Sequence, residues 1–533
     1  MIRDTLTTAV RAALEAAGIE PPAEVHLERP GRREHGDWSS NVALATSKAH
    51  GRKPRDVAEE LAAWLNANPP AHVERVELAG PGFVNFHLHD TWLHEVLADV
   101  VAAGEEGFAR PDLGGGLRVD VEFVSANPTG PLHAGGGRWA AYGDALCNVL
   151  ERCGYVPPRE YYLNDRGVQM ELFAASLAAR KAGEPPPEDG YQGEYIAEWA
   201  AEMPDDADPA EWGYERVKQD LANSLRGIGV EFDTWFSEKS LVESGAIEAT
   251  LADLREHGAA FDADGAVWLR STDDGDDKDR VLVKSDGEPT YLLPDIAYHR
   301  DKFARGHQLL IDVWGADHHG YVSRLKAGVE ALGHSSEELE IILGQLVSLV
   351  RGGKEVKLSK RSGDIVLLDD LVEAVGADVA RLTFFLQSLD TRQTIDLDLI
   401  TAQSNENPVF YVQYANARIH SIGRRAAEAG IERAPFADAD LTLLAHEREL
   451  DVLRKLSELP EVVALACHDR APHKITTWVR ELADRFHGFY HDCYVIGDVA
   501  PELTQARLWL VEAARTGLAI GLDLLGVSAP EAM

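Results

Sequence analysis

The fold of this chain is decided by the stretch VEFVSANPTGPLHAGG, residues 121–136. It begins as an apolar run typical of a β-strand, crosses a loop that contains Pro128 and Pro131, and opens a helix at a pair of glycines. In an open parallel sheet, ligands bind beyond the carboxyl ends of the strands. We therefore expect this loop to face a binding crevice.

The helix that starts near Gly135 suits a phosphate group. Its first turn exposes unpaired N–H groups at the positive end of the helix dipole. Gly135 and Gly136 let a nucleotide approach the backbone closely, and His133 can donate a hydrogen bond to a phosphate oxygen. The alternative for this segment is a glycine-rich helix start with a satisfied surface histidine.

The flanking residues complete a strand–helix–strand unit. Residues 117–124 alternate like a strand, residues 135–152 have helical character up to Gly154, and residues 159–163 form a second strand. This order predicts parallel pairing through a right-handed crossover. Because a second strand and helix follow near residues 309–332, we predict an α/β fold.

The rest of the chain divides around this core. Residues 1–105 are typical of a small α/β domain, and residues 401–533 are helical throughout, which indicates a bundle. We assign residues 116–400 to the central domain, with an insertion of helices and acidic loops at about 170–280.

Composition limits the kinds of protein that fit this chain. Its 533 residues, 45% hydrophobic and 26% charged, suit a protein of several globular domains. No apolar run reaches the roughly 18 residues that span a bilayer, and polar residues interrupt the N-terminus, so we expect no membrane segment and no signal peptide. Four scattered cysteines without a Cys-x-x-Cys pair predict no zinc site and a cytoplasmic location. We also expect no dedicated metal site and a monomer.

The net charge of −37 argues against a nucleic-acid partner, because backbone binding depends on Lys and Arg. A local basic face can still coexist with an acidic remainder. The candidate clusters, each of which could equally be ordinary solvated surface, are Arg29, Arg32, Arg33, Lys48, Arg52, Lys53 and Arg55, and Arg418, Arg424 and Arg425.

A second segment with phosphate-binding character follows the central core. The apolar run at residues 346–350, the Gly352-Gly353 turn and the run that starts at Val356 predict a hairpin that presents a basic loop. Within that loop, Lys357, Ser359 and Lys360 suit a polyphosphate, which they would stabilise electrostatically. A basic loop alone is common and does not specify a function.

Together, residues 133–136 (HAGG) and 357–361 (KLSKR) resemble the HIGH and KMSKS signatures of class I aminoacyl-tRNA synthetases. The resemblance to the arginine-specific family is closer and covers nearly the whole chain. Further matching segments are residues 35–43, 79–86, 289–291, 295–298, 314–319 and 411–418. The resemblance implies a Rossmann-like catalytic domain with a parallel sheet, an additional N-terminal tRNA-binding domain, and a C-terminal all-α anticodon-binding bundle.

The resemblance also implies roles for individual residues. Glu122 and Asn127 would hold the polar ends of arginine, and Tyr291 and Asp295 would hold its side chain. A carboxylate can accept two guanidinium N–H groups side by side, and an aromatic ring can cover the flat face of the guanidinium. The alternative for Asp295 is a helix-start carboxylate that the helix dipole stabilises.

The remaining expected site residues follow from the same resemblance. The catalytic residues would be His133, Lys357 and Lys360, and ATP would be bound by His133, Gly135, Gly136, Lys357, Ser359 and Lys360. Transfer RNA would contact Tyr411, Tyr414 and Arg418.

The implied activity is that of an arginine–tRNA ligase in translation, with L-arginine, tRNA(Arg) and ATP as partners and Mg²⁺ carried on ATP. Gly136 departs from the family, which has the second histidine of HIGH there. Glutamyl-tRNA synthetases also use His-x-Gly-Gly, but Asp295 would repel a glutamate side chain. Two alternatives stay open: a divergent paralogue that supplies activated arginine to a non-translational acceptor, and a non-catalytic synthetase-like binding protein.

Replacing Lys360 by alanine tests the role of the basic loop. With glycine at position 136, the loop lysines carry charge stabilisation that is normally shared more widely. Loss of one such donor costs about 2.7–4 kcal/mol, so kcat of Lys360→Ala should fall roughly 100- to 1000-fold in arginine-dependent ATP–pyrophosphate exchange. On the sequence alone, Gly136→His should be tolerated or modestly activating. An unchanged kcat in Lys360→Ala would refute the role of the loop.

Overall fold

The computed structural model of the chain describes residues 2–356, 367–402 and 407–532. The chain forms two compact units. The first combines Met1–Phe108, Ile419–Glu458 and Asp484–Gly517, and the second combines Ala109–Arg418, Leu459–Ala483 and Leu518–Met533. Our division into three consecutive domains stays a prediction, because this grouping draws on segments that are distant in sequence.

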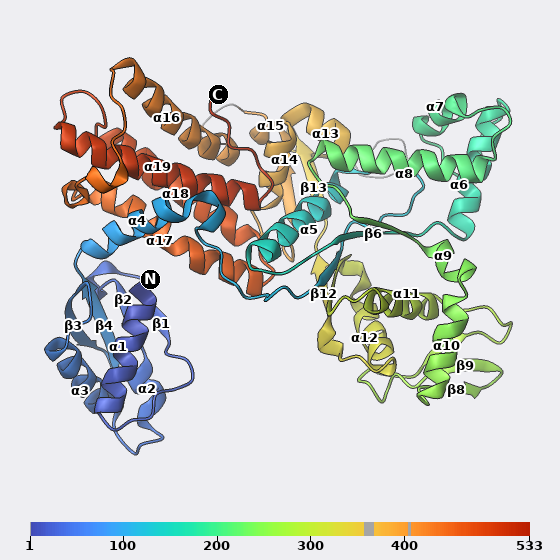
Figure 1. The fold of residues 1–533 in the computed structure, drawn as a ribbon. Coiled ribbons are helices and arrows are strands. Elements are labelled where there is room, and N and C mark those ends of the chain that lie inside the picture. The colour runs from blue at the N-terminus through green and yellow to red at the C-terminus, as the bar shows by residue number, and fades with distance from the viewer. Residues whose placement is uncertain (1, 357–366, 403–406, 533) are drawn as a thin grey trace. The chain divides into compact units, whose positions relative to one another are not determined.

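The N-terminal part of the first unit is a four-stranded antiparallel sheet with helices (Figure 1). Apolar residues at helical spacing, such as Leu6, Val10 and Leu14, place one face of the first helix in the core. The strands in sheet order are β1 (Leu27–Glu28), β2 (Trp38–Ser40), β4 (Phe83–Leu88) and β3 (Val73–Ala79). The helices are α1 (Ile2–Ala16), α2 (Val42–Ser47), α3 (Pro54–Ala67) and α4 (Thr91–Gly107).

Long helices make up most of the C-terminal region. They are α16 (Pro408–Glu428), α17 (Glu447–His468), α18 (His473–Asp492) and α19 (Pro501–Leu524), and each contributes residues to both units. Within the first unit, Arg507 donates to the fully buried Glu449 at 2.6 Å. The expected all-helical character of this region is confirmed.

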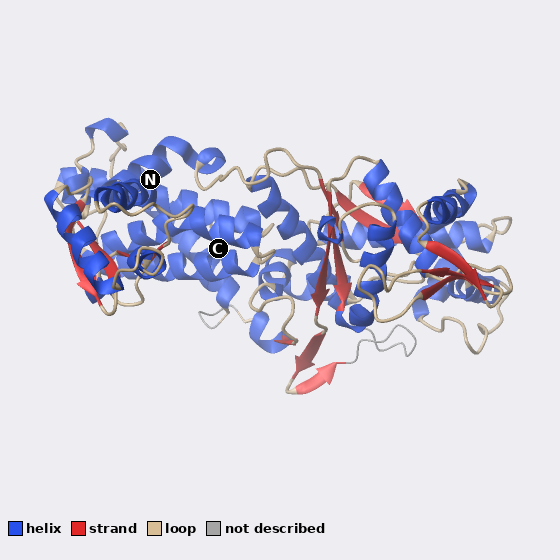
Figure 2. Ribbon diagram, turned by 90° about the horizontal axis from the view of Figure 1, so that it is seen from below, coloured by secondary structure: helices blue, strands red, loops and turns tan. Residues whose placement is uncertain are grey.

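A five-stranded, entirely parallel sheet lies at the centre of the second unit. In sheet order, its strands are β12 (Leu339–Gly344), β11 (Leu309–Gly315), β5 (Val119–Glu122), β6 (Arg159–Leu163) and β7 (Thr234–Ser237). Helix α5 (Ala134–Arg152) connects β5 to β6, and α12 (Val322–Ala331) connects β11 to β12. Figure 2 distinguishes the strands, in red, from the helices, in blue. The predicted α/β fold and the parallel pairing of β5 with β6 are confirmed.

The segment between β6 and α11 (Leu292–Ala304) carries the expected insertion. Helices α6 (Val168–Lys181), α7 (Glu194–Glu202) and α8 (Pro209–Gly227) enclose a small core of their own around Phe173, Leu177 and Trp199. After β7 come α9 (Glu238–Glu243), α10 (Ala246–Glu256) and an antiparallel sheet of β8 (Ala260–Ala263), β9 (Ala266–Leu269) and β10 (Arg280–Val283).

The predicted hairpin around Gly352-Gly353 is also present. Strand β13 (Val347–Arg351) pairs antiparallel with β14 (Lys354–Val356) and parallel with β15 (Gln393–Asp396). Gly352 and Gly353 have φ angles of 57° and 72°, which glycine adopts without strain. Helices α13 (Leu368–Val375), α14 (Ala377–Phe384) and α15 (Leu397–Ile400) flank β15 in sequence.

Two further findings concern the part of the chain that the structure describes. No helix within residues 2–356, 367–402 and 407–532 combines the length and the apolar character needed to cross a membrane. The four cysteines Cys147, Cys153, Cys467 and Cys493 are buried and free.

The packing of α5 on the sheet generates a stability prediction. A Cβ atom on Gly143 would lie 2.1 Å from Cγ of the buried Phe123 ring, whereas one on the exposed Gly423 of α16 would meet nothing within 4 Å. Overpacking costs about 1–3 kcal/mol, so Gly143→Ala should lower the free energy of unfolding by that amount. Gly423→Ala should raise it by roughly 0.5–1 kcal/mol, because alanine is the better helix former. Urea unfolding of both variants measures the difference, and equal stabilities would contradict this description of the α5 packing.

Candidate active site

A cavity of about 440 Å³ opens at the carboxyl ends of β5 and β11. This is the edge at which ligands bind in parallel sheets, and the volume is that of a small-molecule site. Its walls include the end of β5 and the following loop, the start of α5, the first turns of α11, and the end of β11 with the residues that follow it. Tyr162 of β6 and Leu346 complete the lining. The polar groups in those walls include Glu122, Ser125, His133, Asp295, His299, Asp312, Asp317, His318 and Tyr321.

The loop after β5 is held in an unusual backbone conformation. Val124 and Ser125 have φ angles of 69° and 38°, in a region that non-glycine residues rarely adopt. Ser125 Oγ donates to Glu122 Oε1 at 2.9 Å and accepts from the backbone N–H of Tyr162 at 3.1 Å. These bonds hold the strained loop in place, as is common at functional sites.

His133 caps the N-terminus of α5. Its Nδ1 accepts a hydrogen bond from the N–H of Gly136 at 3.1 Å, so in this arrangement the ring proton is on Nε2. His133 and Gly136 both line the cavity, and Gly135 is buried in the same first turn. The strand-to-helix geometry that we predicted for the phosphate site is therefore present.

The expectation that histidine is tolerated at position 136 stays a prediction, and the side chain that it would meet is that of Leu132. A Cβ atom on Gly136 would lie 2.6 Å from Cδ1 and 3.0 Å from Cγ of Leu132, which is buried. Any side chain at this position therefore requires Leu132 to move. Because the nearest atom is the end of the Leu132 side chain and not backbone, the effect of Gly136→His depends on how far that side chain can shift.

Asp295 lies in the first turn of α11 and lines the cavity. The Tyr321 hydroxyl donates to its Oδ2 at 2.5 Å. Burial raises the pKa of Asp295 to about 6, although the hydrogen bond from Tyr321 opposes that shift. A desolvated carboxylate of this kind is suited to a cationic ligand.

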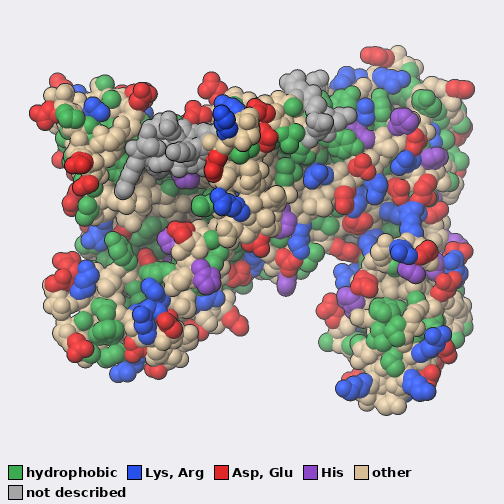
Figure 3. All heavy atoms as spheres, turned by 180° about the vertical axis from the view of Figure 1, so that it is seen from behind, with side chains coloured by type: hydrophobic (Ala, Val, Ile, Leu, Met, Phe, Trp, Pro, Cys, Tyr) green, Lys and Arg blue, Asp and Glu red, His purple; other side chains and the backbone are tan. Residues whose placement is uncertain are grey.

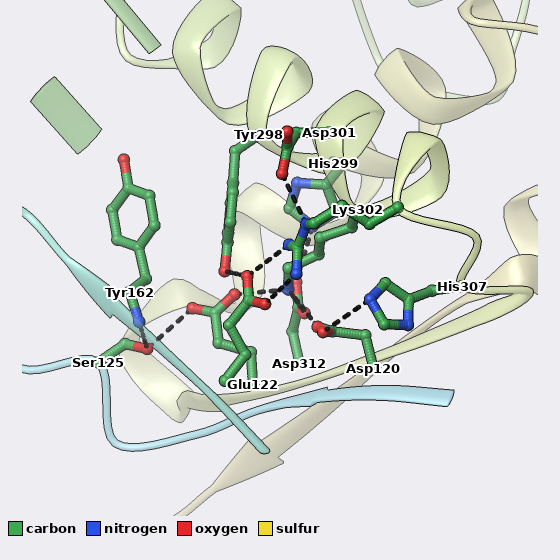
Figure 4. Close-up of polar contacts among 12 residues, drawn as sticks. Asp120, Glu122, Ser125, Tyr162, Tyr298, His299, Asp301, Lys302, His307 and Asp312 are labelled. Carbon is green, nitrogen blue, oxygen red and sulfur yellow. Dashed lines mark hydrogen bonds and ion pairs between the residues drawn. The ribbon is translucent and has the colours of Figure 1, made fainter. Parts of the chain in front are cut away.

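Beneath the cavity, Lys302 is fully buried among three carboxylates (Figure 4). Its Nζ lies 2.7 Å from Glu122 Oε2, 2.9 Å from Asp312 Oδ1 and 3.1 Å from Asp120 Oδ1. Burial lowers the pKa of Lys302, but the carboxylates outweigh that effect and hold the pKa well above its usual value. Lys302 therefore stays charged and fixes the orientation of Glu122.

His299 joins the same network. Its Nδ1 donates to the carbonyl of Asp295 and its Nε2 to Oδ2 of Asp312, both at 2.8 Å. Because both ring nitrogens face acceptors, the ring is protonated in this arrangement. Burial lowers the pKa of His299, but the charge and hydrogen bond of Asp312 outweigh burial and raise the pKa overall.

Sequence reasoning missed the residues of this network, namely Asp120, His299, Lys302, Asp312 and Tyr321. Two signals could have found most of them. Asp295, His299 and Lys302 follow an i, i+4, i+7 spacing, which lies along one face of a helix. Asp312 interrupts an otherwise apolar strand.

Several predicted site residues are not in the cavity wall. Tyr291 is 82% exposed, and Asn127 is exposed and donates to Gln169 Oε1 at 2.8 Å. Neither is among the residues that line the cavity. Lys357, Ser359 and Lys360 lie outside the described residues. The arginine-binding role of Tyr291 and Asn127 stays a prediction.

The predicted tRNA contacts lie on α16. The Arg418 guanidinium is 4.4 Å from the centroid of the Tyr414 ring, and Tyr414 stacks on Phe410 with ring centroids 5.7 Å apart. Tyr411, one turn earlier on the same helix, is partly buried.

The N-terminal basic cluster is interspersed with acidic partners. Arg33 donates to Asp451 at 2.6 Å, Arg55 to Glu59 at 3.3 Å, and Arg32 to Glu34 at 3.4 Å. Figure 3 shows the same mixing of basic and acidic side chains over the face that it displays. These pairs weaken the case for a purely basic face, because each partner carboxylate competes with a phosphate.

Three protein families match the chain. Residues 4–88 match the arginyl tRNA synthetase N terminal domain, residues 222–384 the catalytic domain of the class I (R) tRNA synthetases, and residues 412–533 the DALR anticodon binding domain.

Whole-length relatives match as well. The arginine–tRNA ligase of Frankia alni is 48% identical over 553 aligned residues, which cover 100% of this chain and 99% of the relative. Arginine–tRNA ligase 1 of Halalkalibacterium halodurans is 45% identical, with 100% and 98% covered.

Solved structures give the same result for the fold. A putative arginyl tRNA synthetase from Campylobacter jejuni is 34% identical with a TM-score of 0.76, and the match covers 84% of this chain and 100% of that one. The Thermus thermophilus arginyl-tRNA synthetase, at 22% identity, has the same fold with a TM-score of 0.79 and full coverage of both chains. The cavity at the end of the parallel sheet fits this comparison, because it brings a helix N-terminus and a partly buried carboxylate together. Since relatives that are 45–48% identical match over the full length, the chain belongs to the arginine–tRNA ligase family of class I aminoacyl-tRNA synthetases.

Proposed function

We propose that the cavity at the carboxyl ends of β5 and β11 activates L-arginine with ATP and that the chain then transfers the arginyl group to tRNA(Arg) for translation. The observation that carries this assignment is the partly buried Asp295 carboxylate, which lines the same cavity as the N-terminus of α5. One end of the cavity suits a guanidinium and the other suits a phosphate. None of the matched relatives supports a non-translational or non-catalytic alternative.

The chemistry needs no protein nucleophile. An oxygen of the arginine carboxylate attacks the α-phosphorus of ATP, the bond to the bridging oxygen breaks, and pyrophosphate leaves with that oxygen. A terminal hydroxyl of the tRNA then attacks the carbonyl carbon of the adenylate, and AMP leaves. Positioning and charge stabilisation supply the rate in such reactions.

Different protein groups bind arginine and ATP. Asp295 pairs with the guanidinium, and Glu122, held by Ser125 and Lys302, faces the polar end of arginine. The N–H groups at the start of α5 and the Nε2–H of His133 face the phosphates, at the positive end of the helix dipole. Lys357 and Lys360 stabilise the leaving pyrophosphate, and Mg²⁺ arrives as part of the ATP substrate.

We infer that tRNA(Arg) contacts the helical C-terminal region of the chain. The stacked Tyr414 and Arg418 of α16, with Tyr411 beside them, present a flat aromatic and cationic surface that suits RNA bases and phosphates. A cytoplasmic monomer is the form that we propose, and four buried free thiols are compatible with a reducing compartment.

Replacing Asp295 by alanine tests the arginine site. Truncating one partner of a buried charge pair costs about 2–5 kcal/mol, so kcat/KM for arginine in ATP–pyrophosphate exchange should fall roughly 30- to several-thousand-fold. The matched control is Asp253→Ala. Asp253 lies on α10 and pairs at 2.6 Å with Arg300 of α11, the helix that also carries Asp295, but Asp253 does not line the cavity. A loss confined to the KM for ATP, or an equal loss in the control, would refute the assignment.

The pH dependence of arginine use should report the Asp295 carboxyl. Its pKa is raised to about 6, so the carboxyl becomes protonated and loses its attraction for the guanidinium as pH falls through 6. Because kcat/KM reports the free enzyme, kcat/KM for arginine should fall below that pH.

The variant Tyr321→Phe identifies the group whose protonation causes kcat/KM for arginine to fall at low pH, the acid limb of the pH profile. It removes a hydrogen bond that lowers the Asp295 pKa, so the pH below which kcat/KM falls should move to a higher value. An acid limb that stays in place in Tyr321→Phe would exclude Asp295 as the titrating group.

A further inference from the structure

Trp139 is the feature of the cavity that the chemistry above leaves unused. It lies on α5, one turn beyond Gly136, and lines the cavity together with Leu132 and Leu346. The side chain is only 9% exposed, so it contributes a large, fixed apolar surface to the wall. An indole in this position can contact whatever fills this end of the cavity.

The indole N–H of Trp139 has no hydrogen-bond acceptor among residues 2–356, 367–402 and 407–532. Tryptophan Nε1 is a donor only. Elsewhere in the same unit, Nε1 of Trp268 donates to the carbonyl of Ala263 at 3.1 Å. Because Trp139 lines the cavity and its N–H has no acceptor in the described part of the chain, no protein group competes with a ligand acceptor for this donor.

The surroundings allow the ring to sit where it does. A Cβ atom on Gly344, at the end of β12, would lie 3.1 Å from Nε1 of Trp139, so a glycine there leaves the N–H edge uncrowded. One turn toward the helix start, Gly136 has no side chain, and Leu132 fills the space next to it. Two residues at the start of α5 bring a side-chain hydrogen-bond donor to the described part of the cavity wall. One is the N-cap His133, and the other is Trp139.

Its distance along the helix separates Trp139 from the phosphate site. Trp139 lies six residues after the cap, or about 9 Å along the axis at 1.5 Å per residue. Phosphates are stabilised within the first turn, where the unpaired N–H groups point outward. The carboxylates that suit arginine, in contrast, lie on α11 and β11. The part of the substrates that remains for Trp139 is the nucleoside of ATP.

We propose that Trp139 is an ATP-binding residue whose indole N–H donates to a ribose hydroxyl oxygen of the nucleotide. The inference rests on the proposed function, because it assumes that ATP occupies this cavity. Gly136 has no side chain that could contact the nucleotide. The indole N–H of Trp139 would supply a polar side-chain contact from the same helix, α5.

The variant Trp139→Phe keeps an aromatic ring and removes the donor. In ATP–pyrophosphate exchange, the KM for ATP should rise about 3- to 10-fold, which is the effect of losing one neutral hydrogen bond, while the KM for arginine stays the same. Trp268→Phe is the matched control, since it removes an indole hydrogen bond in the same unit but outside the cavity, and should leave the KM for ATP unchanged. An unchanged KM for ATP in Trp139→Phe, or equal rises for ATP and arginine, would overturn the proposal.

Substrate analogues identify the acceptor. Wild-type enzyme should use 2′-deoxy-ATP or 3′-deoxy-ATP less well than ATP, and Trp139→Phe should lose about 3- to 10-fold of that preference for one of them. A preference that is equal in both proteins would exclude a ribose hydroxyl as the acceptor and overturn the proposal. If Trp139→Phe does not fold, the wild-type result decides, because an enzyme indifferent to both analogues makes no such bond.

Fluorescence separates this inference from the proposed function. ATP should change the tryptophan emission of wild-type enzyme and of Trp268→Phe, and the change should be smaller in Trp139→Phe. If the wild type catalyses no arginine-dependent exchange either with or without tRNA(Arg), but this emission change is present, the proposed function fails and the nucleotide contact stands. If exchange is normal and the emission change is the same in all three proteins, the contact fails and the proposed function stands.

Discussion

The active-site region depends on one buried cation, the ammonium of Lys302. Strands β5 and β11 are neighbours in the parallel sheet, and Glu122 and Asp312 are direct partners in their register. Like charges opposite each other destabilise a sheet, and Asp120, two residues before Glu122, adds a third buried carboxylate. Lys302 lies within 3.1 Å of all three. Without it, the centre of the sheet would hold uncompensated buried charge, which costs several kcal/mol.

The same cation connects the sheet to the cavity wall. Lys302, His299 and Asp295 lie along one face of α11, so the helix that carries Asp295, the carboxylate that we propose for the guanidinium, is anchored to the sheet by its own side chains. His299 links α11 to β11 directly, because it donates hydrogen bonds to the carbonyl of Asp295 and to the carboxylate of Asp312. A site built in this way has its carboxylates oriented before the substrate arrives, which is the condition for electrostatic catalysis.

The sequence predicted well whatever depends on local pattern. Strand β6 matches the predicted range 159–163, α5 begins within one residue of its predicted start, and the glycine hairpin is present, because apolar periodicity and glycine punctuation act over short distances. Asp295 was also found, through the resemblance of its segment to a known family, and it does line the cavity.

What the sequence could not predict depends on contacts across the fold. Lys302 and Asp120 are 182 positions apart in the chain, and only the pairing of β5 with β11 brings α11 above both. The exposure of Tyr291, the contact between Tyr321 and Asp295, and the Leu132 side chain beside Gly136 are also products of packing. A helix pattern alone could not distinguish Trp139 in the cavity wall from an ordinary core residue, because both positions are buried and apolar.

The charges around the cavity explain why a cation belongs there. Glu122, Asp295 and Asp312 line it, and the protein supplies Lys302 and the protonated His299 against them and against Asp120. Burial raises the pKa of Asp120 to about 7, although Lys302 opposes that shift. Asp295 responds in the same direction, since burial raises its pKa as well. Under the proposed function, the guanidinium of arginine would take the place of the proton that Asp295 otherwise takes up. Because burial makes the charged carboxylate less favourable there than in water, a cationic ligand would stabilise it.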